Sequence, residues 1–287
     1  MTAAINRVLG FVMLIRPVNC GMMGFAVIVG AALAGNETLF QLHQGLFLGF
    51  ATGFFLTAAT MTINDYYDRK IDAINEPRRP IPSGLVRPNE ALAYASVLTA
   101  LGFASAALTN WQSLLTASFS WAVFVLYTTK GKSTGLPGNL MVSFCIAVPF
   151  IYGGFAVGKS LLLTTSIFVA TVFLSNTGRE ITKGIIDIEG DKENNIGTIA
   201  VLCGEGKAAF AAAAFYFSAI LLTPIPWILG LVSFWYLPFV ALTDFGLASA
   251  SIALLLNPSR EKARKAKSQN LLWFSIGLLA FVTGTLH

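Results

Sequence analysis

The chain has 287 residues, of which 55% are hydrophobic and only 11% charged, and its mean hydropathy is +0.69. Soluble domains carry about 25% charged residues, so this composition excludes a soluble globular enzyme, a disordered chain, a collagen-like fibre and a disulfide scaffold. The net charge of +5 reflects 19 Lys and Arg against 14 Asp and Glu. The sequence predicts a polytopic membrane protein with one functional domain over residues 1–287.

Apolar stretches recur along the whole chain, each long enough to cross the hydrocarbon as a helix, which takes about 20 residues. They lie at roughly 10–34, 42–66, 89–108, 111–129, 138–157, 161–186, 207–231, 233–256 and 268–286. Backbone polar groups must pair internally in lipid, and these lengths suit helices better than barrel strands. The expected fold is therefore an all-α membrane protein with nine transmembrane helices in one bundle.

Basic residues are distributed unequally between the two sets of connections. Of the 19 Lys and Arg, all but Lys159 lie on the N-terminal side or near connections that follow even-numbered spans. By the positive-inside rule, the N-terminus and these connections are cytoplasmic and the C-terminal His287 lies outside. The first span resembles a signal peptide, but Arg16, Pro17 and Asn19 interrupt its apolar run, so we expect a retained helix.

Acidic residues gather at the predicted cytoplasmic ends of the second and sixth spans. The two clusters are Asp65, Asp68, Asp72 and Glu76, and Asp187, Glu189, Asp191 and Glu193. On a helix, Asp65, Asp68 and Asp72 fall within about 60° of one face, and Asp187 and Asp191 are one turn apart. The equivalent placement indicates two similar halves, about 1–157 and 158–287.

Clustered carboxylates repel one another and are costly at a membrane boundary, so two facing clusters need a cation between them. Carboxylate and amide oxygens suit Mg²⁺ or Mn²⁺, and Mg²⁺ leaves part of its shell to water and substrate phosphates. Nearby Lys and Arg would complete a diphosphate site. The residues alone leave two alternatives open, namely solvated helix ends held by salt bridges and the acidic gate of a transporter.

At these residues the sequence resembles the UbiA superfamily of intramembrane prenyltransferases. The segment 64–72 matches the pattern N-D-x-x-D-x-x-x-D at every fixed position, and 187–191 matches D-x-x-x-D. Similar segments elsewhere are Arg16-Pro17-Val18-Asn19, Arg78-Arg79-Pro80-Ile81-Pro82-Ser83-Gly84, and Tyr127-Thr128 followed by Lys130, Lys132 and Gly138-Asn139. With Gly197-Thr198 after the second motif, these features are spread from the first span to the seventh.

The resemblance implies a bundle around a central cavity that opens to the cytoplasm and laterally to lipid. It also implies transfer of a prenyl group from an isoprenyl diphosphate donor to a lipophilic acceptor, with two Mg²⁺ ions for which Mn²⁺ substitutes. The likeness is greatest to the archaeal branch that geranylgeranylates geranylgeranylglyceryl phosphate, and it rests on residues 14–20, compact loops and the basic stretch 262–265. An aromatic acceptor such as 4-hydroxybenzoate stays open, and haem prenylation is less favoured.

The resemblance and the local chemistry together nominate site residues. The metal ligands are Asn64, Asp65, Asp68, Asp187 and Asp191. The substrate-binding residues are Arg16, Asn19, Arg69, Arg79, Tyr127, Lys130, Lys132, Arg179 and Lys183. The catalytic residues are Asp68, Asp72 and Asp191, with Asp68, Asp72 or a diphosphate oxygen left open as the base. Asp244 either lines the cavity or forms a hydrogen bond between helices. Membrane lipids surround the protein, and we expect no nucleic acid and no obligatory protein partner.

Overall fold

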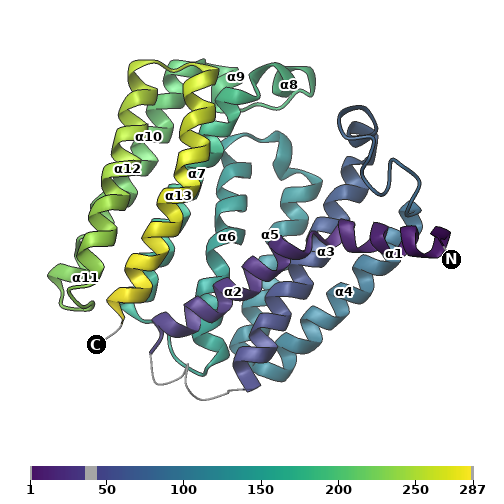
Figure 1. Ribbon diagram of the computed structural model, residues 1–287, viewed down its shortest axis with the longest axis horizontal. Helices are drawn as coiled ribbons and strands as arrows, with labels where there is room; N and C mark the ends of the chain where they lie inside the picture. The colour runs from purple at the N-terminus through teal and green to yellow at the C-terminus, as the bar shows by residue number, and fades with distance from the viewer. Residues whose placement is uncertain (1, 36–43, 286–287) are drawn as a thin grey trace.

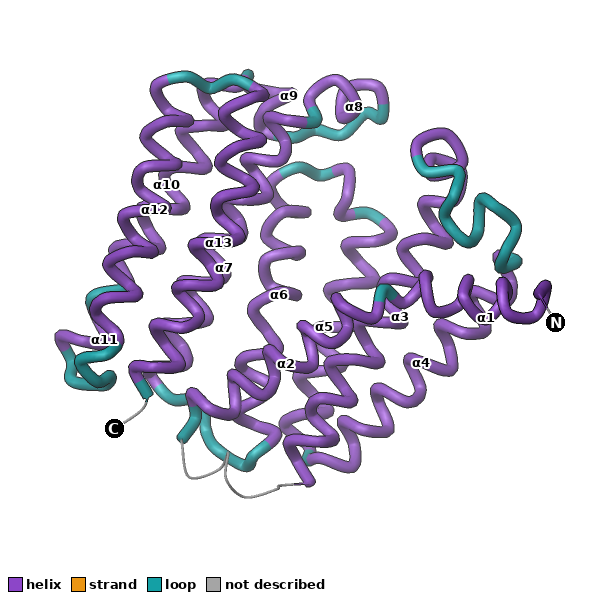
Figure 2. Tube along the Cα trace, in the orientation of Figure 1, coloured by secondary structure: helices purple, strands orange, loops and turns teal. Residues whose placement is uncertain are grey.

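The computed structural model describes residues 2–35 and 44–285. Within these ranges the protein consists of helices and loops without a strand (Figure 2). The helices in chain order are α1 (Thr2–Ile15), α2 (Pro17–Leu33), α3 (Gln44–Asn75), α4 (Pro88–Thr109), α5 (Trp111–Thr129), the 3₁₀ turn η2 (Gly131–Ser133), α6 (Leu136–Ala156), α7 (Leu163–Ile186), α8 (Ile188–Glu193), α9 (Ile199–Cys203), α10 (Glu205–Leu222), α11 (Ile225–Ile228), α12 (Tyr236–Leu256) and α13 (Arg260–Gly284). The all-helical prediction is confirmed for these residues.

Local sequence accounts for several helix ends. Pro17 disfavours a helical conformation at the residue before it, and Arg16 accordingly has a φ of 49°, which separates α1 from α2. Asn110 lies between α4 and α5, where its side chain accepts a hydrogen bond of 2.8 Å from the backbone nitrogen of Ser113. Ser259 caps α13 in the same way. Each cap satisfies a backbone donor that the first helical turn leaves free.

Every predicted span overlaps one of these helices. Within the part of the chain that the structure describes, six helical segments are long and apolar enough to cross a membrane, namely Arg7–Leu33, Gln44–Ile74, Pro88–Thr109, Leu136–Ala156, Glu205–Ile228 and Tyr236–Leu256. The predicted spans 111–129, 161–186 and 268–286 correspond to α5, α7 and α13. The helix α7 carries Arg179, Glu180 and Lys183, and α13 begins with a basic stretch. Membrane crossing by α5, α7 and α13 therefore stays a prediction.

The helices form two groups with α6 between them. Figure 1 shows α7, α10, α12 and α13 together on one side and α3, α4 and α5 on the other, while α2 crosses the lower middle of the view and packs against both α6 and α3. A buried hydrogen bond of 2.6 Å from Asn270 Nδ2 to Tyr216 Oη joins α13 to α10. Glycines allow α2 and α6 to approach closely, because a Cβ added at Gly153 would lie 2.0 Å from the carbonyl oxygen of Val27.

The acidic motifs lie at the same end of the bundle. The C-terminal end of α3, the loop after it, and α8 and α9 all lie at the top of the view in Figure 1, whereas α11 lies at the opposite end. Helix α3 continues to Asn75, beyond the apolar stretch that predicted it. It therefore carries the whole first motif on helical backbone. The second motif begins at Asp187, directly after α7, and continues into α8.

Candidate active site

Two of the acidic residues of α3 are buried in an ion-pair network. Asp65 is only 3% exposed, and its Oδ1 accepts a hydrogen bond of 2.7 Å from Arg16 Nη2. Arg79 Nη1 lies 2.7 Å from Asp72 Oδ2 and 3.5 Å from Asp65 Oδ1. Arg16 stands at the break before α2 and Arg79 in the loop after α3. The network therefore joins three segments and neutralises carboxylates that would be costly to bury alone.

Asp68 has a different environment from its two neighbours on α3. Lys132 Nζ donates to both of its carboxylate oxygens, at 2.8 and 2.7 Å, and Asn64 Nδ2 donates to Oδ2 at 3.0 Å. The Asp68 side chain is 25% exposed. An ammonium group bound to both oxygens shows that this position stabilises a cation. Lys132 comes from η2, so the contact connects α3 to the segment after α5.

The second motif is more open than the first. Asp187 is exposed at the C-terminal end of α7, and Asp191 is half-buried one turn later in α8. The backbone nitrogen of Asp191 donates to the carbonyl oxygen of Asp187 at 2.8 Å, which holds the two residues at helical spacing. The pKa of Asp191 is raised above its usual value, mainly by burial and also by the charge of Asp187. A hydrogen bond from Thr198 and the charge of Lys183 partly offset this rise.

Glu180 on α7 is a largely buried carboxylate that pairs with two of the nominated basic residues and lies outside both acidic motifs. Its side chain is 10% exposed, and it accepts a hydrogen bond of 2.8 Å from Lys183 Nζ. Arg179 Nη1 donates to the same carboxylate at 3.3 Å. The sequence does mark Glu180, because it is an acid between Arg179 and Lys183 in an otherwise apolar span. Ionisable residues in such spans are functional or paired. Arg179 and Lys183 are thus already linked to an anion on their own helix.

The remaining nominated residues are not all brought to the acidic motifs. Arg69 donates to the backbone oxygen of Tyr66 at 2.6 Å, and its guanidinium lies 4.3 Å over the ring of the same residue. Asn19 and Lys130 are exposed. Tyr127 is partly buried in the last turns of α5, where it lines a cavity. The structure therefore gathers Arg16, Arg79 and Lys132 around the α3 carboxylates and leaves Asn19, Arg69 and Lys130 outside that network.

The donor set at each motif fits Mg²⁺. Among residues 2–35 and 44–285, no three His, Cys, Asp or Glu side chains converge as a metal-binding group. Mg²⁺ does not require such a group, because it commonly binds one or two carboxylates and completes its shell with water and phosphate oxygens. Asn64 with Asp68, and Asp187 with Asp191, each offer one such set. In this structure the positive charge next to the Asp68 carboxylate is the ammonium group of Lys132.

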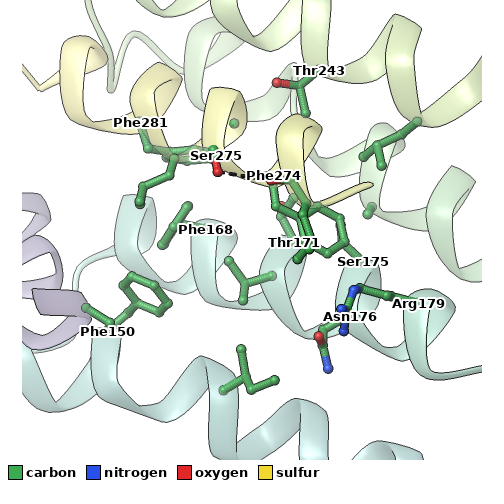
Figure 3. A pocket seen from close by; sticks show the side chains of 18 of the residues that line it. Phe150, Phe168, Thr171, Ser175, Asn176, Arg179, Thr243, Phe274, Ser275 and Phe281 are labelled. Carbon is green, nitrogen blue, oxygen red and sulfur yellow. Dashed lines mark hydrogen bonds between the residues drawn. The ribbon is translucent and has the colours of Figure 1, made fainter. Parts of the chain in front are cut away.

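An apolar cavity of about 610 Å³ lies between α2, α6, α7, α10, α12 and α13. Figure 3 shows Asn176 and Arg179 at one end of it and Phe150, Phe168 and Phe281 at the other. Asn176 Nδ2 donates to Ser143 Oγ at 3.1 Å, which fixes the amide at the polar end. The cavity thus leads from the charged turns of α7 into an aromatic interior.

Asp244 satisfies both of the roles considered for it. It lines this cavity, and its Oδ2 accepts a hydrogen bond of 2.7 Å from Thr223 Oγ1, which joins α12 to the end of α10. Among the described residues, Oδ1 of Asp244 is buried without a hydrogen-bond partner. The carboxyl is therefore both a link between helices and a polar group within an apolar space.

Acidic motifs with basic partners at one end of a bundle of apolar helices, together with an apolar cavity between the helices, are the features expected of an intramembrane enzyme that acts on a charged lipid. The chain belongs to the UbiA prenyltransferase family, which it matches over residues 23–277. This membership confirms the resemblance seen at the two Asp motifs.

Individual relatives match the chain over nearly its whole length. It is 35% identical to the digeranylgeranylglyceryl phosphate synthase of Natronomonas pharaonis, covering 96% of this chain and 99% of the relative. A solved structure that concerns "Digeranylgeranylglyceryl phosphate synthase in membranes" is 31% identical, with a TM-score of 0.87, and the match covers 98% of this chain and 99% of that one. A UbiA homolog from Archaeoglobus fulgidus bound to GPP and Mg²⁺ is 17% identical and has the same fold, with a TM-score of 0.67 over 95% of this chain and 99% of that one.

Proposed function

We propose that the protein is a Mg²⁺-dependent prenyltransferase that transfers a geranylgeranyl group from geranylgeranyl diphosphate to the free hydroxyl of geranylgeranylglyceryl phosphate. The product is a diether lipid precursor. Family membership and the near full-length similarity to a relative of that name support the proposal. The observation that carries it is the Asp68 carboxylate, which Asn64 and Lys132 contact near the C-terminal end of α3. The second acidic motif lies at the same end of the bundle.

The proposed arrangement in the membrane follows from the basic residues. The single domain crosses the bilayer nine times, with two similar halves of about 1–157 and 158–287. The N-terminus and the loops that carry the acidic motifs are cytoplasmic, and the C-terminus is outside. The excess of Lys and Arg in the connections after even-numbered spans supports this orientation.

Two metal ions are part of the proposal, with Mn²⁺ able to replace Mg²⁺. Asn64 and Asp68 would hold one ion, and Asp187 and Asp191 the other. When bound, divalent ions neutralise charge that develops on the leaving diphosphate. The position of Lys132 beside Asp68 supports a further role, in which its ammonium group donates hydrogen bonds to diphosphate oxygens. The same role is proposed for Lys183, whose charge acts on Asp191 and whose ammonium group contacts Glu180.

In the transfer, the allylic C–O bond to the diphosphate breaks and a new C–O bond to the acceptor hydroxyl forms. The hydroxyl proton passes to Asp68 or to a diphosphate oxygen. Asp72 is 6% exposed and bonded to Arg79 at 2.7 Å, which supports a positioning role for this carboxylate rather than contact with substrate. The aromatic and aliphatic lining of the cavity excludes water, which would otherwise capture the electrophilic carbon.

The test uses purified protein in detergent or lipid with Mg²⁺, labelled geranylgeranyl diphosphate and either geranylgeranylglyceryl phosphate or 4-hydroxybenzoate. Diphosphate release and product mass are measured for the wild type, Asp68→Ala and Asp191→Ala, with and without a chelator. We expect a diether product that disappears in both variants and on chelation. A product formed only from 4-hydroxybenzoate would replace the lipid acceptor with an aromatic one. No transfer to either acceptor by folded protein would contradict the proposal and favour a transporter.

A further inference from the structure

Two neighbouring apolar cavities in the bundle share two lining residues. The larger, of about 610 Å³, lies between α2, α6, α7, α10, α12 and α13 (Figure 3). The smaller, of about 280 Å³, lies between α2, α3, α5 and α6. Met23 of α2 and Ile146 of α6 line both cavities. These two side chains therefore lie where the two cavities adjoin.

The smaller cavity ends beside the first acidic motif. Met61 lines it one turn before Asp65 on α3, and Tyr127 lines it shortly before Lys132. Arg16 Nη1 donates to Met61 Sδ at 3.6 Å, so the cationic network of α3 reaches this end of the cavity. The cavity extends along α3 from Met61 to Thr52, a distance of about 14 Å at the helical rise.

The polar end of the larger cavity carries a different cationic residue from the Arg16 and Lys132 side chains near the smaller one. Arg179 lines it at the polar end, and its buried Nε has no hydrogen-bond partner among the described residues. From Arg179 the cavity follows α7 to Phe168, a distance of about 16 Å. A buried guanidinium nitrogen without an acceptor is a free donor for an anionic oxygen. The two cavities thus combine similar apolar interiors with two separate polar ends.

The proposed reaction joins two lipids with long isoprenoid chains. Resting on that proposed function, we propose that each chain has its own cavity. The donor's geranylgeranyl chain lies in the smaller cavity, with its diphosphate at Asp68 and Lys132. The acceptor's chain lies in the larger cavity, with its phosphate or glycerol oxygens toward Arg179. Met23 and Ile146 keep the two chains apart until their polar ends meet. Each chain then buries its apolar surface independently of the other.

Chain-length dependence tests this assignment. Of these two cavities, Thr57 of α3 lines only the smaller and Thr171 of α7 only the larger. Thr57→Phe and Thr171→Phe each fill one cavity, whereas Thr57→Ser and Thr171→Ser leave it open. Each variant is assayed with geranylgeranyl or geranyl diphosphate as donor, and with acceptors that carry a C20 or a C10 chain. Unfolding temperatures in detergent establish that the variants are folded.

We expect Thr57→Phe to lower kcat/KM for the C20 donor by at least about tenfold. Leaving two methylene groups of the donor chain without a place in the cavity has an effect of about that size. Its kcat/KM for the C10 donor changes much less, and the acceptor's chain length makes no difference. Thr171→Phe shows the converse dependence on the acceptor. The reverse pairing, or no dependence on chain length in either variant, would overturn the inference.

A second measurement uses the wild type and so does not depend on the stability of the variants. A donor or an acceptor with a photoreactive diazirine at the chain end is crosslinked, and the labelled peptides are identified. The donor should label α3 and α5, and the acceptor α7 and α13. Labelling of the same helices by both probes would overturn the inference. Transfer by the wild type with both C20 substrates tests the proposed function separately, since it does not depend on which cavity holds which chain.

Discussion

Lys132 Nζ contacts both carboxylate oxygens of Asp68, at 2.8 and 2.7 Å, across 64 residues of sequence. The ammonium comes from the turn after α5 and the carboxylate from the end of α3. In this arrangement Asp68 is neutralised before any substrate binds. In the proposed mechanism Asp68 would hold a divalent ion and Lys132 would then be free to contact the diphosphate, which would couple the metal site to the binding of the donor.

Replacing Lys132 should separate metal binding from catalysis. In Lys132→Ala, we expect kcat to fall by about 10²–10³-fold, the usual effect of removing one donor to a developing negative charge. Mg²⁺ should bind more tightly in the absence of donor, because no ammonium competes for Asp68. Diphosphate release and Mg²⁺ titration measure the two effects.

The control for this change is Lys70→Ala, which removes an exposed lysine of α3 that lies one turn beyond Tyr66. It should leave both quantities near their wild-type values. If Lys132→Ala weakened Mg²⁺ binding, the competition between the ammonium and the metal would be contradicted.

Much of the fold could be predicted because hydropathy reports membrane helices directly. One inaccurate boundary is the end of α3, which continues to Asn75 although its apolar stretch ends near residue 66. Charged residues at the end of a membrane helix carry no hydropathy signal, so helical continuation there depends on tertiary contacts. The ion pairs of Asp65 with Arg16 and of Asp72 with Arg79 supply such contacts.

The site could be predicted as far as spacing along one helix allows. The contact of Asn64 with Asp68 follows from their separation by one turn. The contact of Lys132 with Asp68 could not be derived in this way, because it depends on how α3 and α5 pack. For the same reason Asp65, nominated as a metal ligand, was not recognised as the buried partner of Arg16. Sequence spacing identifies which acids share a face, and packing decides which of them remain free.

Breaking the buried network of α3 should destabilise the protein. Arg79→Met leaves Asp72 without its partner at 2.7 Å and removes the second cation near Asp65. Because the Arg79 side chain is 33% exposed, we expect a loss near the lower end of the range for buried pairs, about 3 kcal/mol. Thermal unfolding in detergent measures the loss. The double variant Arg79→Met with Asp72→Asn should recover part of it, and additivity of the two single changes would contradict a direct pairing.

The contact between α2 and α6 should be intolerant of a single methyl group. A Cβ at Gly30 would lie 2.2 Å from the carbonyl oxygen of Phe150, and the obstacle is backbone rather than a flexible side chain. We expect Gly30→Ala to destabilise the protein by about 1–3 kcal/mol. Gly206→Ala on α10 is the control, since nothing lies within 4 Å of a Cβ there. In this control the higher helix propensity of Ala should leave the unfolding temperature unchanged or slightly raised.

The acid limit of activity should respond to Thr198. Burial raises the pKa of Asp191, and the hydrogen bond from Thr198 opposes that shift by favouring the ionised carboxylate. In the proposed metal site Asp191 must be ionised to bind a cation, so metal binding should be lost as the pH falls through this pKa. Thr198→Val removes the hydrogen bond and raises the pKa further. The acid limb of kcat/KM should therefore move to higher pH, and higher Mg²⁺ concentrations should move it back.

Thr198 also caps α9 by accepting a hydrogen bond of 3.3 Å from the backbone nitrogen of Val201, so Thr198→Ser is the matched variant that keeps both interactions. Its pH profile should coincide with that of the wild type. A uniform loss of activity in Thr198→Val, without a shift of the acid limb, would show that the cap alone matters. A shift that Mg²⁺ reverses would identify Asp191 as the titrating ligand, because a cation bound to a carboxylate competes with its proton.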